Sequence, residues 1–96
     1  MKINVEFLGL PMVSDVVGKT RLELVFSGET VKDVIDELIQ QYGKKVRNAF
    51  YDSDGKFDVM IQIALNGKSF IPPEKHQSPL LREGDTLMFM ILLAGG

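Results

Sequence analysis

One amphipathic stripe in the middle of the chain limits the available folds more than any other feature. Between Thr30 and Gly43 the spacing of apolar residues predicts one helix over 31–42 with a single buried face. Thr30 and Asp33 have the spacing of an N-cap with an acidic residue in the first turn, and Gly43 suits the C-cap. We predict no other long helix, and one helix must bury its stripe against a sheet. The stripe consists of Val31, Val34, Ile35, Leu38, Ile39 and Tyr42.

Alternating apolar and polar residues on both sides of this helix predict the strands of that sheet. We expect the first two strands to form a hairpin across a loop at 11–19, and Asn66-Gly67 to turn the third strand into the fourth. The last strand is apolar on both faces, which favours a central place, parallel to the first strand. Residues 44–57 show no clear period and are predicted to be irregular, with a turn at 52–55. The predicted strands cover 3–10, 20–26, 59–65, 68–71 and 86–93.

This order of elements predicts an α+β fold of the β-grasp (ubiquitin-like) type. We expect a mixed sheet of four to five strands with one main helix on one face. A length of 96 residues fits a single domain, which we place at 1–93. Residues 94–96 are then a flexible C-terminal Gly-Gly tail.

Composition argues against several classes of protein. The net charge of −2 gives no reason to expect nucleic-acid binding, which needs a clustered excess of Lys and Arg. No apolar run approaches the roughly 18 residues of a membrane span, and Lys2 and Glu6 interrupt what would be a signal peptide, so we expect a cytoplasmic protein with no membrane partner. Cysteine is absent, which excludes disulfides, thiolate metal sites and cysteine nucleophiles.

The chain ends in Gly95 and Gly96, which follow the last predicted strand after Ala94. Residues without a Cβ make a thin tether that can carry a terminal carboxylate into the active site of another protein. That carboxylate is ionised at neutral pH and is a poor acyl donor until it is activated. The structural alternative is a frayed or truncated end without a role.

Several short motifs resemble the ubiquitin-like sulfur carrier family, and most closely the small subunit of molybdopterin synthase. They are the helix start at 30–34, Leu65-Asn66-Gly67, the segment 79–87 and Ala94-Gly95-Gly96. The resemblance covers nearly the whole chain. Two departures are Ile91-Leu92-Leu93, where the family usually has a Pro-containing segment, and a longer loop at 70–78.

The resemblance implies a carrier protein and not an enzyme. An adenylating, E1-like partner would use ATP to activate Gly96, and a sulfur donor protein would convert the acyl-adenylate to a thiocarboxylate. A larger sulfur-accepting synthase subunit would then receive the sulfur. The chain itself would bind no cofactor and no metal, and Gly95 would serve as part of the tail.

Two other classes share the same chain end. A protein modifier would join Gly96 to lysines of other proteins, and a plain ubiquitin-like binding module would have an incidental tail. For a carrier, molybdopterin is the first choice of acceptor pathway. Thiamine, tRNA or amino-acid synthesis stays open.

The last predicted strand also suggests a docking surface. If Leu87, Phe89, Ile91 and Leu93 face the helix, the intervening side chains point to the other face of the sheet. We expect an apolar stripe there that guides partners to the tail, and methionine suits a surface that serves several partners. The alternative is that 72–73 and 44–57 fold over this face and bury it. The predicted docking residues are Met60, Met88, Met90 and Leu92.

Two further motifs are assigned no function. His76, the one histidine of the chain, lies in a polar, Pro-rich loop and is predicted to be a surface residue. The segment 52–58 resembles part of a calcium loop but lacks the full ligand spacing, so we predict a solvated turn.

Overall fold

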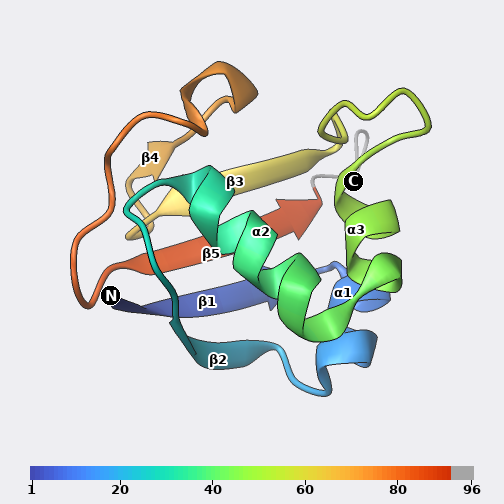
Figure 1. Ribbon diagram of the computed structural model, residues 1–96, viewed down its shortest axis with the longest axis horizontal. Coiled ribbons are helices and arrows are strands. Elements are labelled where there is room, and N and C mark those ends of the chain that lie inside the picture. The colour runs from blue at the N-terminus through green and yellow to red at the C-terminus, as the bar shows by residue number, and fades with distance from the viewer. Residues whose placement is uncertain (92–96) are drawn as a thin grey trace.

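The structure is a computed structural model and describes residues 1–91. Five strands, three helices and one 3-10 turn follow one another along the described chain (Figure 1). Their bounds are β1 Lys2–Leu8, α1 Pro11–Val17, β2 Arg21–Val25, α2 Val31–Tyr42, α3 Lys44–Phe50, β3 Ile61–Leu65, β4 Ser69–Phe70, the 3-10 turn Pro73–Lys75 and β5 Thr86–Ile91.

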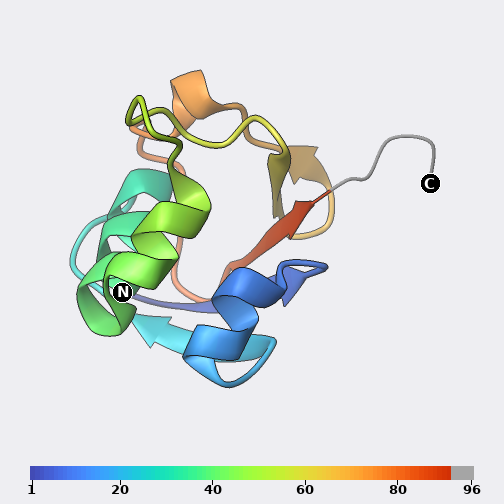
Figure 2. The ribbon, with the colours of Figure 1, turned by 90° about the vertical axis from the view of Figure 1, so that its right-hand side faces the viewer.

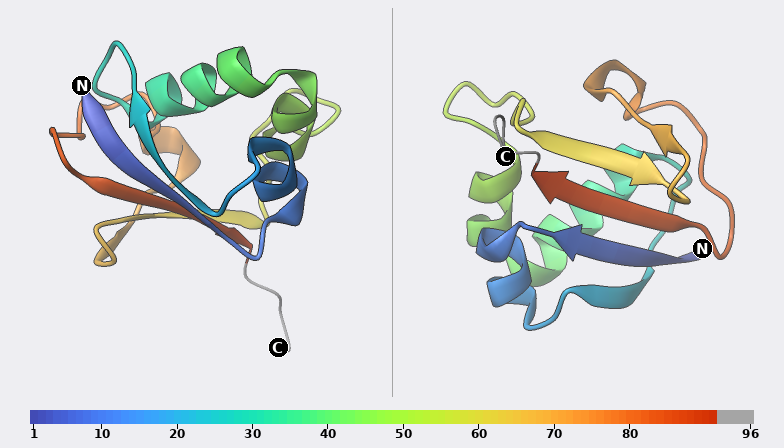
Figure 3. Two further views of the ribbon diagram at one scale, coloured as in Figure 1. Left: turned by 90° about the horizontal axis from the view of Figure 1, so that it is seen from below. Right: turned by 180° about the vertical axis from the view of Figure 1, so that it is seen from behind.

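The five strands form one mixed sheet in the order β2-β1-β5-β3-β4. β1 and β5 are parallel, and all other neighbours are antiparallel. The three helices lie over one face of the sheet (Figure 2; Figure 3, left). This arrangement is the predicted β-grasp, and it confirms the central place of β5 beside β1.

The core lies between the sheet and the helices, and α2 forms as its sequence predicts. Alternate residues of β1 and β5 point inward, and both Leu87 and Phe89 are completely buried. Thr30 Oγ1 accepts a hydrogen bond from the Asp33 N–H at 3.0 Å, and Asp33 Oδ2 accepts one from the Thr30 N–H at 3.1 Å. Burial raises the pKa of the Asp33 carboxyl, but hydrogen bonds to the carboxylate from the Thr30 side chain and from the N–H groups of Glu29 and Thr30 hold the pKa below its ordinary value. The apolar stripe of α2 buries Val31, Val34, Ile35 and Leu38.

Two short helices correct the predictions made for the irregular segments. The loop expected at 11–19 contains α1, which begins at Pro11 and ends at Gly18 in the left-handed conformation. The segment 44–57 begins with α3, whose Val46, Ala49 and Phe50 are buried at helical spacing. Each helix has seven residues, and a period of 3.6 is difficult to recognise over so short a span.

The strand predicted at 59–65 begins later in the structure. Val59 is 83% exposed, and the Met60 N–H donates to Asp58 Oδ1 in a turn that precedes β3. Asp58 therefore keeps the first part of the predicted segment out of the sheet.

A polar network fixes the start of β5 against the turn that follows β3. Asn66 Nδ2 donates to Asp85 Oδ1 at 3.1 Å, and Asn66 Oδ1 accepts from the Thr86 N–H at 2.8 Å. Asp85 Oδ2 also accepts from the Arg82 N–H at 2.8 Å. Asn66 is the one described residue other than glycine with a positive φ, at 54°. The motifs around Asn66 and Asp85 thus have a structural role in setting the register of β5.

Candidate functional site

The predicted tail follows β5, the central strand of the sheet. Gly95, Gly96 and Leu92 lie outside the described residues, which end at Ile91. The last residues of β5 are paired on both sides, with Leu8 opposite Met90 and Ile61 opposite Ile91. This end of β5 lies on the side of the molecule that carries α1 and α3 (Figure 1). The sheet therefore holds Ile91, which precedes the predicted tail at 94–96, in a fixed position.

The face of the sheet opposite the helices is open. Within residues 1–91, no helix or loop crosses this face (Figure 3, right). The helix α3 lies with α1 and α2 on the other side (Figure 3, left). The described part of the segments 44–57 and 72–73 therefore does not cover the face, contrary to the alternative considered from the sequence.

Cross-strand pairing places a group of apolar side chains on the open face. Met88 of β5 pairs with Ala64 of β3, and Ala64 pairs with Phe70 of β4. In the next row toward the end of β5, Leu8 pairs with Met90. Directly paired residues point to the same face of a sheet. We call Leu8, Ala64, Phe70, Met88 and Met90 the apolar patch.

The predicted docking residues differ in exposure. Met88 is half-buried, and Met90 is covered by its surroundings, with 9% of its surface exposed. Met60 is 45% exposed but lies in the turn before β3. Alternation along β5 does place Met88 and Met90 on the face away from the fully buried Leu87 and Phe89.

Sequence reasoning missed the two most exposed members of the apolar patch. Leu8 is 58% exposed and Phe70 is 62% exposed. Leu8 follows Phe7 in the strand, so alternation alone places its side chain on the open face. Phe70 lies in a strand of two residues, and its side could be assigned only from its pairing with Ala64.

The other half of the open face carries paired charges. Lys2 Nζ lies 3.2 Å from Glu23 Oε2, and Arg21 Nε lies 3.8 Å from Glu6 Oε2. Exposed ion pairs of this kind add little stability. They give the open face a polar half over β1 and β2 beside the apolar patch, so a partner that contacts both halves must match two different surfaces.

Two other features of the described residues are a hollow beside α2 and α3 and the turn at 52–55. Within residues 1–91, no three or more His, Cys, Asp or Glu side chains gather closely enough to hold a metal ion. A hollow of about 610 Å³ between α2 and α3 is lined by side chains of both charges. One of them, Lys32, donates a hydrogen bond to Asp36 at 2.8 Å. The predicted turn at 52–55 is confirmed, since Asp52 Oδ1 accepts from the N–H groups of Asp54 and Lys56.

Two other predictions from the sequence concern membrane spans and His76. None of the helices in the described part of the chain is long and apolar enough to cross a membrane. His76 is buried, with 7% of its surface exposed, so the prediction of a surface histidine is wrong. The polar residues around His76 in the sequence gave no sign that its own side chain turns inward.

The sheet order, the helices on one face and the open apolar patch define a ubiquitin-like β-grasp protein. The profile of the ThiS family matches residues 13–96. The chain therefore belongs to the ThiS family of ubiquitin-like sulfur carriers. A search among curated proteins finds no similar sequence.

Solved structures share the fold at low sequence identity. The crystal structure of SAMP1 from Haloferax volcanii has a TM-score of 0.74 at 18% identity and covers 100% of both chains. A putative molybdopterin converting factor subunit 1 from Pyrococcus furiosus has a TM-score of 0.63 at 19% identity, with 97% of this chain and 99% of that chain covered. The Amycolatopsis orientalis BexX/CysO complex contains a chain with a TM-score of 0.65 at 20% identity, with coverage of 98% and 99%.

Proposed function

We propose that this protein carries sulfur on its Gly96 carboxylate. A partner enzyme activates the carboxylate with ATP, and a sulfur donor protein then converts it to a thiocarboxylate. The protein is a co-substrate of these enzymes and binds neither ATP nor a metal itself. The observation that carries the proposal is the family match, which extends through Gly96 and includes β5 and the residues after it.

The chemistry of the proposal requires two transfers. The carboxylate oxygen attacks the α-phosphorus of ATP, and pyrophosphate leaves as the mixed anhydride with AMP forms. A persulfide on the donor then attacks the acyl carbon and AMP leaves, which gives an acyl disulfide between Gly96 and the donor. A second thiol of the donor cleaves the S–S bond of this acyl disulfide, so that the donor leaves as its own disulfide and the thiocarboxylate remains on Gly96. A free carboxylate cannot undergo the second step, because its oxygen is too poor a leaving group.

The structure supports this proposal through the position of β5. The strand lies in the centre of the sheet and is paired on both sides up to Met90, and Ile91 is paired with Ile61 of β3. A rigid strand at the base of the tail reduces the number of positions that the carboxylate samples, which favours its capture by an enzyme. The chain contains no cysteine, which is a second advantage, since no thiol of its own can take the sulfur.

For the pathway, we propose sulfur transfer in molybdopterin synthesis, with a larger synthase subunit as the acceptor. The motif resemblance supports it, as does the fold shared with the putative molybdopterin converting factor subunit. A sulfur carrier for thiamine, tRNA or amino-acid synthesis is the alternative within the same chemistry. Incubating the thiocarboxylate form with candidate acceptor enzymes and following loss of the sulfur would identify the pathway.

A protein modifier is the second candidate function. The fold similarity to SAMP1, which is described as a small archaeal modifier protein, favours it. A modifier would form an isopeptide bond between Gly96 and lysines, and an immunoblot would show bands of high mass that persist in denaturant and thiol. A carrier would show the free chain alone.

We propose that the activating enzyme and the sulfur-accepting enzyme both contact the open face of the sheet at the apolar patch. Met90 lies near the end of β5 and pairs with Leu8 of β1, so an enzyme that contacts them is already close to the tail. Phe70 and Leu8 lie on opposite sides of the apolar patch, on β4 and β1, and each is more than half exposed.

The docking surface can be tested with matched charge substitutions. Phe70→Asp and Leu8→Asp should weaken binding to the activating enzyme at least tenfold in titration calorimetry. Val25→Asp is the control, because Val25 is 66% exposed and pairs with Lys2 at the far edge of the sheet. Equal binding by all three variants would exclude the apolar patch as the docking surface.

The role of Gly96 can be tested by changing the length of the tail. Deleting Gly96 shortens an extended chain by about 3.5 Å, and adding one alanine lengthens it by the same amount. Both variants should keep the wild-type melting temperature and lose ATP–pyrophosphate exchange with the activating enzyme. Full exchange by the extended protein, with the extra residue still present by mass, would refute the role of Gly96.

A further inference from the structure

The segment between β4 and β5 is anchored by one buried titratable side chain. From Pro72 to Leu80, His76 is the only buried residue. Two buried apolar residues, Ile71 and Leu81, flank this stretch. Between these two ends, His76 is therefore the only side chain that fastens the segment to the body of the protein. We call residues 72–80 the clasp segment.

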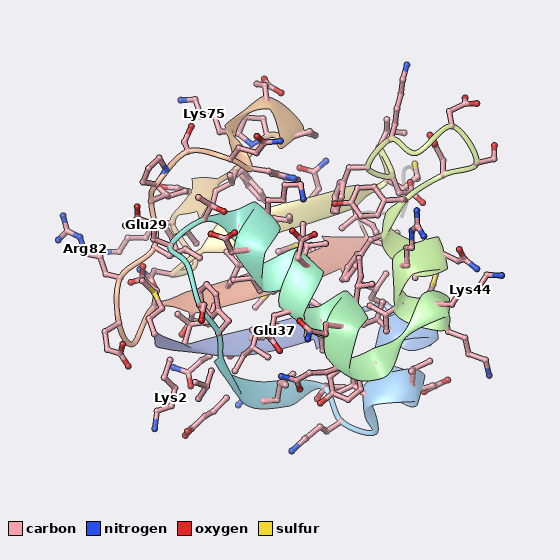
Figure 4. All side chains as sticks on the ribbon, viewed as in Figure 1. Lys2, Glu29, Glu37, Lys44, Lys75 and Arg82 are labelled. Carbon is pink, nitrogen blue, oxygen red and sulfur yellow. The ribbon has the colours of Figure 1, made fainter. Side chains whose placement is uncertain are left out.

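The backbone of the clasp segment bonds to the first turn of α2. The His76 carbonyl accepts a hydrogen bond from the Lys32 N–H at 2.8 Å. The Glu29 carbonyl accepts from the N–H groups of Leu80 and Leu81 at 3.2 and 3.0 Å. In Figure 4, Lys75 projects outward from the turn before His76, and Glu29 lies on the loop that leads into α2. The clasp segment thus covers the start of α2.

The imidazole of His76 lies in an apolar environment. Its ring packs edge-on against Phe57, with ring centres 4.8 Å apart and planes at 90°. Phe57 stacks on Phe50, which is completely buried. The Nε2 atom of His76 is buried and has no hydrogen-bond partner among the described residues. A neutral imidazole tolerates this environment, whereas an imidazolium would have a buried N–H without an acceptor.

The titratable side chains on the elements that pack around His76 are mostly engaged elsewhere. On α2, the Lys32 amine is bonded to Asp36, and Asp33 is bonded within the capping box. On the strand side, Tyr51 packs edge-on against Phe57, and the Asp58 carboxylate accepts the Met60 N–H. In the clasp segment itself, Glu74 and Lys75 are charged, and the charge of Glu74 acts on the imidazole.

Two effects oppose each other at the imidazole. Burial lowers the pKa of His76, while the backbone of Ile71 and the charge of Glu74 raise it, and burial is the larger effect. Attraction between an imidazolium and the Phe57 ring is a modest contribution beside the desolvation of an unpaired charge. The neutral form is therefore the one that the folded clasp segment stabilises.

We propose that His76 makes the clasp segment a pH-dependent element: the neutral imidazole holds the segment against Phe57 and the start of α2, and protonation releases it. The sheet and the tail-bearing strand stay folded in the released state, because the clasp segment contributes no strand to the sheet. Release uncovers Phe57 and frees the Lys32 N–H. This device is independent of the chemistry proposed for Gly96.

Amide hydrogen exchange at pH 7.5 and pH 5.0 tests this proposal. After correction for the intrinsic pH dependence of exchange, the Lys32, Leu80 and Leu81 amides should lose at least tenfold of their protection at pH 5.0. Amides of β5 should keep theirs. The His76→Phe variant keeps an aromatic ring and cannot be protonated, so its clasp segment should stay protected at both pH values.

Several outcomes would overturn the proposal. They are unchanged protection of the wild-type clasp segment at pH 5.0, an equal loss in β5 that indicates global unfolding, or the same pH-dependent loss in His76→Phe. If His76→Phe misfolds, His76→Gln is the second uncharged variant. An NMR titration of the wild-type imidazole gives a separate readout, and an apparent pKa at or above about 6.5 would contradict burial of the neutral form.

Discussion

Replacing Asn66 with alanine should destabilise the protein by about 2–3 kcal/mol, because one side chain fixes the start of the tail-bearing strand. The variant loses the hydrogen bonds to Asp85 at 3.1 Å and from the Thr86 N–H at 2.8 Å. Each such bond contributes about 1 kcal/mol net. Alanine at the φ of 54° found for Asn66 costs about 1 kcal/mol more.

Urea denaturation measures this loss. The midpoint should fall while the slope m stays constant, and the melting temperature should drop by about 8 °C or more. Asn66→Gly loses the same hydrogen bonds but accepts the positive φ, so it should be more stable than Asn66→Ala by up to about 1 kcal/mol. The control is Asn4→Ala, at an exposed position in β1, which should lie within about 0.5 kcal/mol of wild type.

An unfolding free energy of Asn66→Ala within about 0.5 kcal/mol of wild type would contradict this role of Asn66. Strictly additive effects of Asp85→Ala and Asn66→Ala on the unfolding free energy of the double variant would also contradict it. Residues that share a hydrogen bond should instead show a coupling energy of about 0.5 kcal/mol or more.

Three further predictions concern stability. Phe50→Ala should cost about 3–5 kcal/mol in urea denaturation, because Phe50 is 0% exposed and packs on Phe57 and Phe89; a loss below about 1 kcal/mol would contradict this packing. Thr30→Ala should cost about 1 kcal/mol, since the Asp33 N–H loses its acceptor, whereas Thr30→Ser should be close to wild type. The unfolding free energy should fall as the pH drops below about 6.5, because the folded pKa of His76 is lowered and the unfolded chain binds the proton first; an equal slope in His76→Phe would assign the effect to other groups.

The spacing of apolar residues and the residues that cap the helix were sufficient to predict the sheet and its main helix. The stripe of α2 is long enough for its period to be clear, and Thr30 and Gly43 mark its ends. Apolar residues on both faces of the last strand correctly predicted the central position of β5. The two short helices were missed because seven residues give only about two turns, and Pro11 at the start of α1 reads equally well as a loop residue.

The candidate site was predicted only in part. Alternation placed Met88 and Met90 on the open face, but the exposure of each depends on neighbours from other strands that a single sequence does not identify. The same limit explains Phe70, whose place beside Ala64 follows from strand pairing. His76 shows the opposite error, because its burial depends on Phe57 and α2, which are distant in the sequence.

Selective alkylation of the chain end tests the central claim most directly. The protein is co-expressed with an adenylating enzyme and a sulfur donor, treated with a thiol-selective alkylating reagent and fragmented in a mass spectrometer. Intact mass alone is ambiguous, because the 5 methionines can form sulfoxides of nearly the same added mass as an oxygen-to-sulfur exchange. With no cysteine to compete, the account predicts one alkyl group, placed by fragment ions on Gly96 and absent without the adenylating enzyme. An unmodified Gly96 in the presence of both active partners, or alkylation found elsewhere, would contradict it.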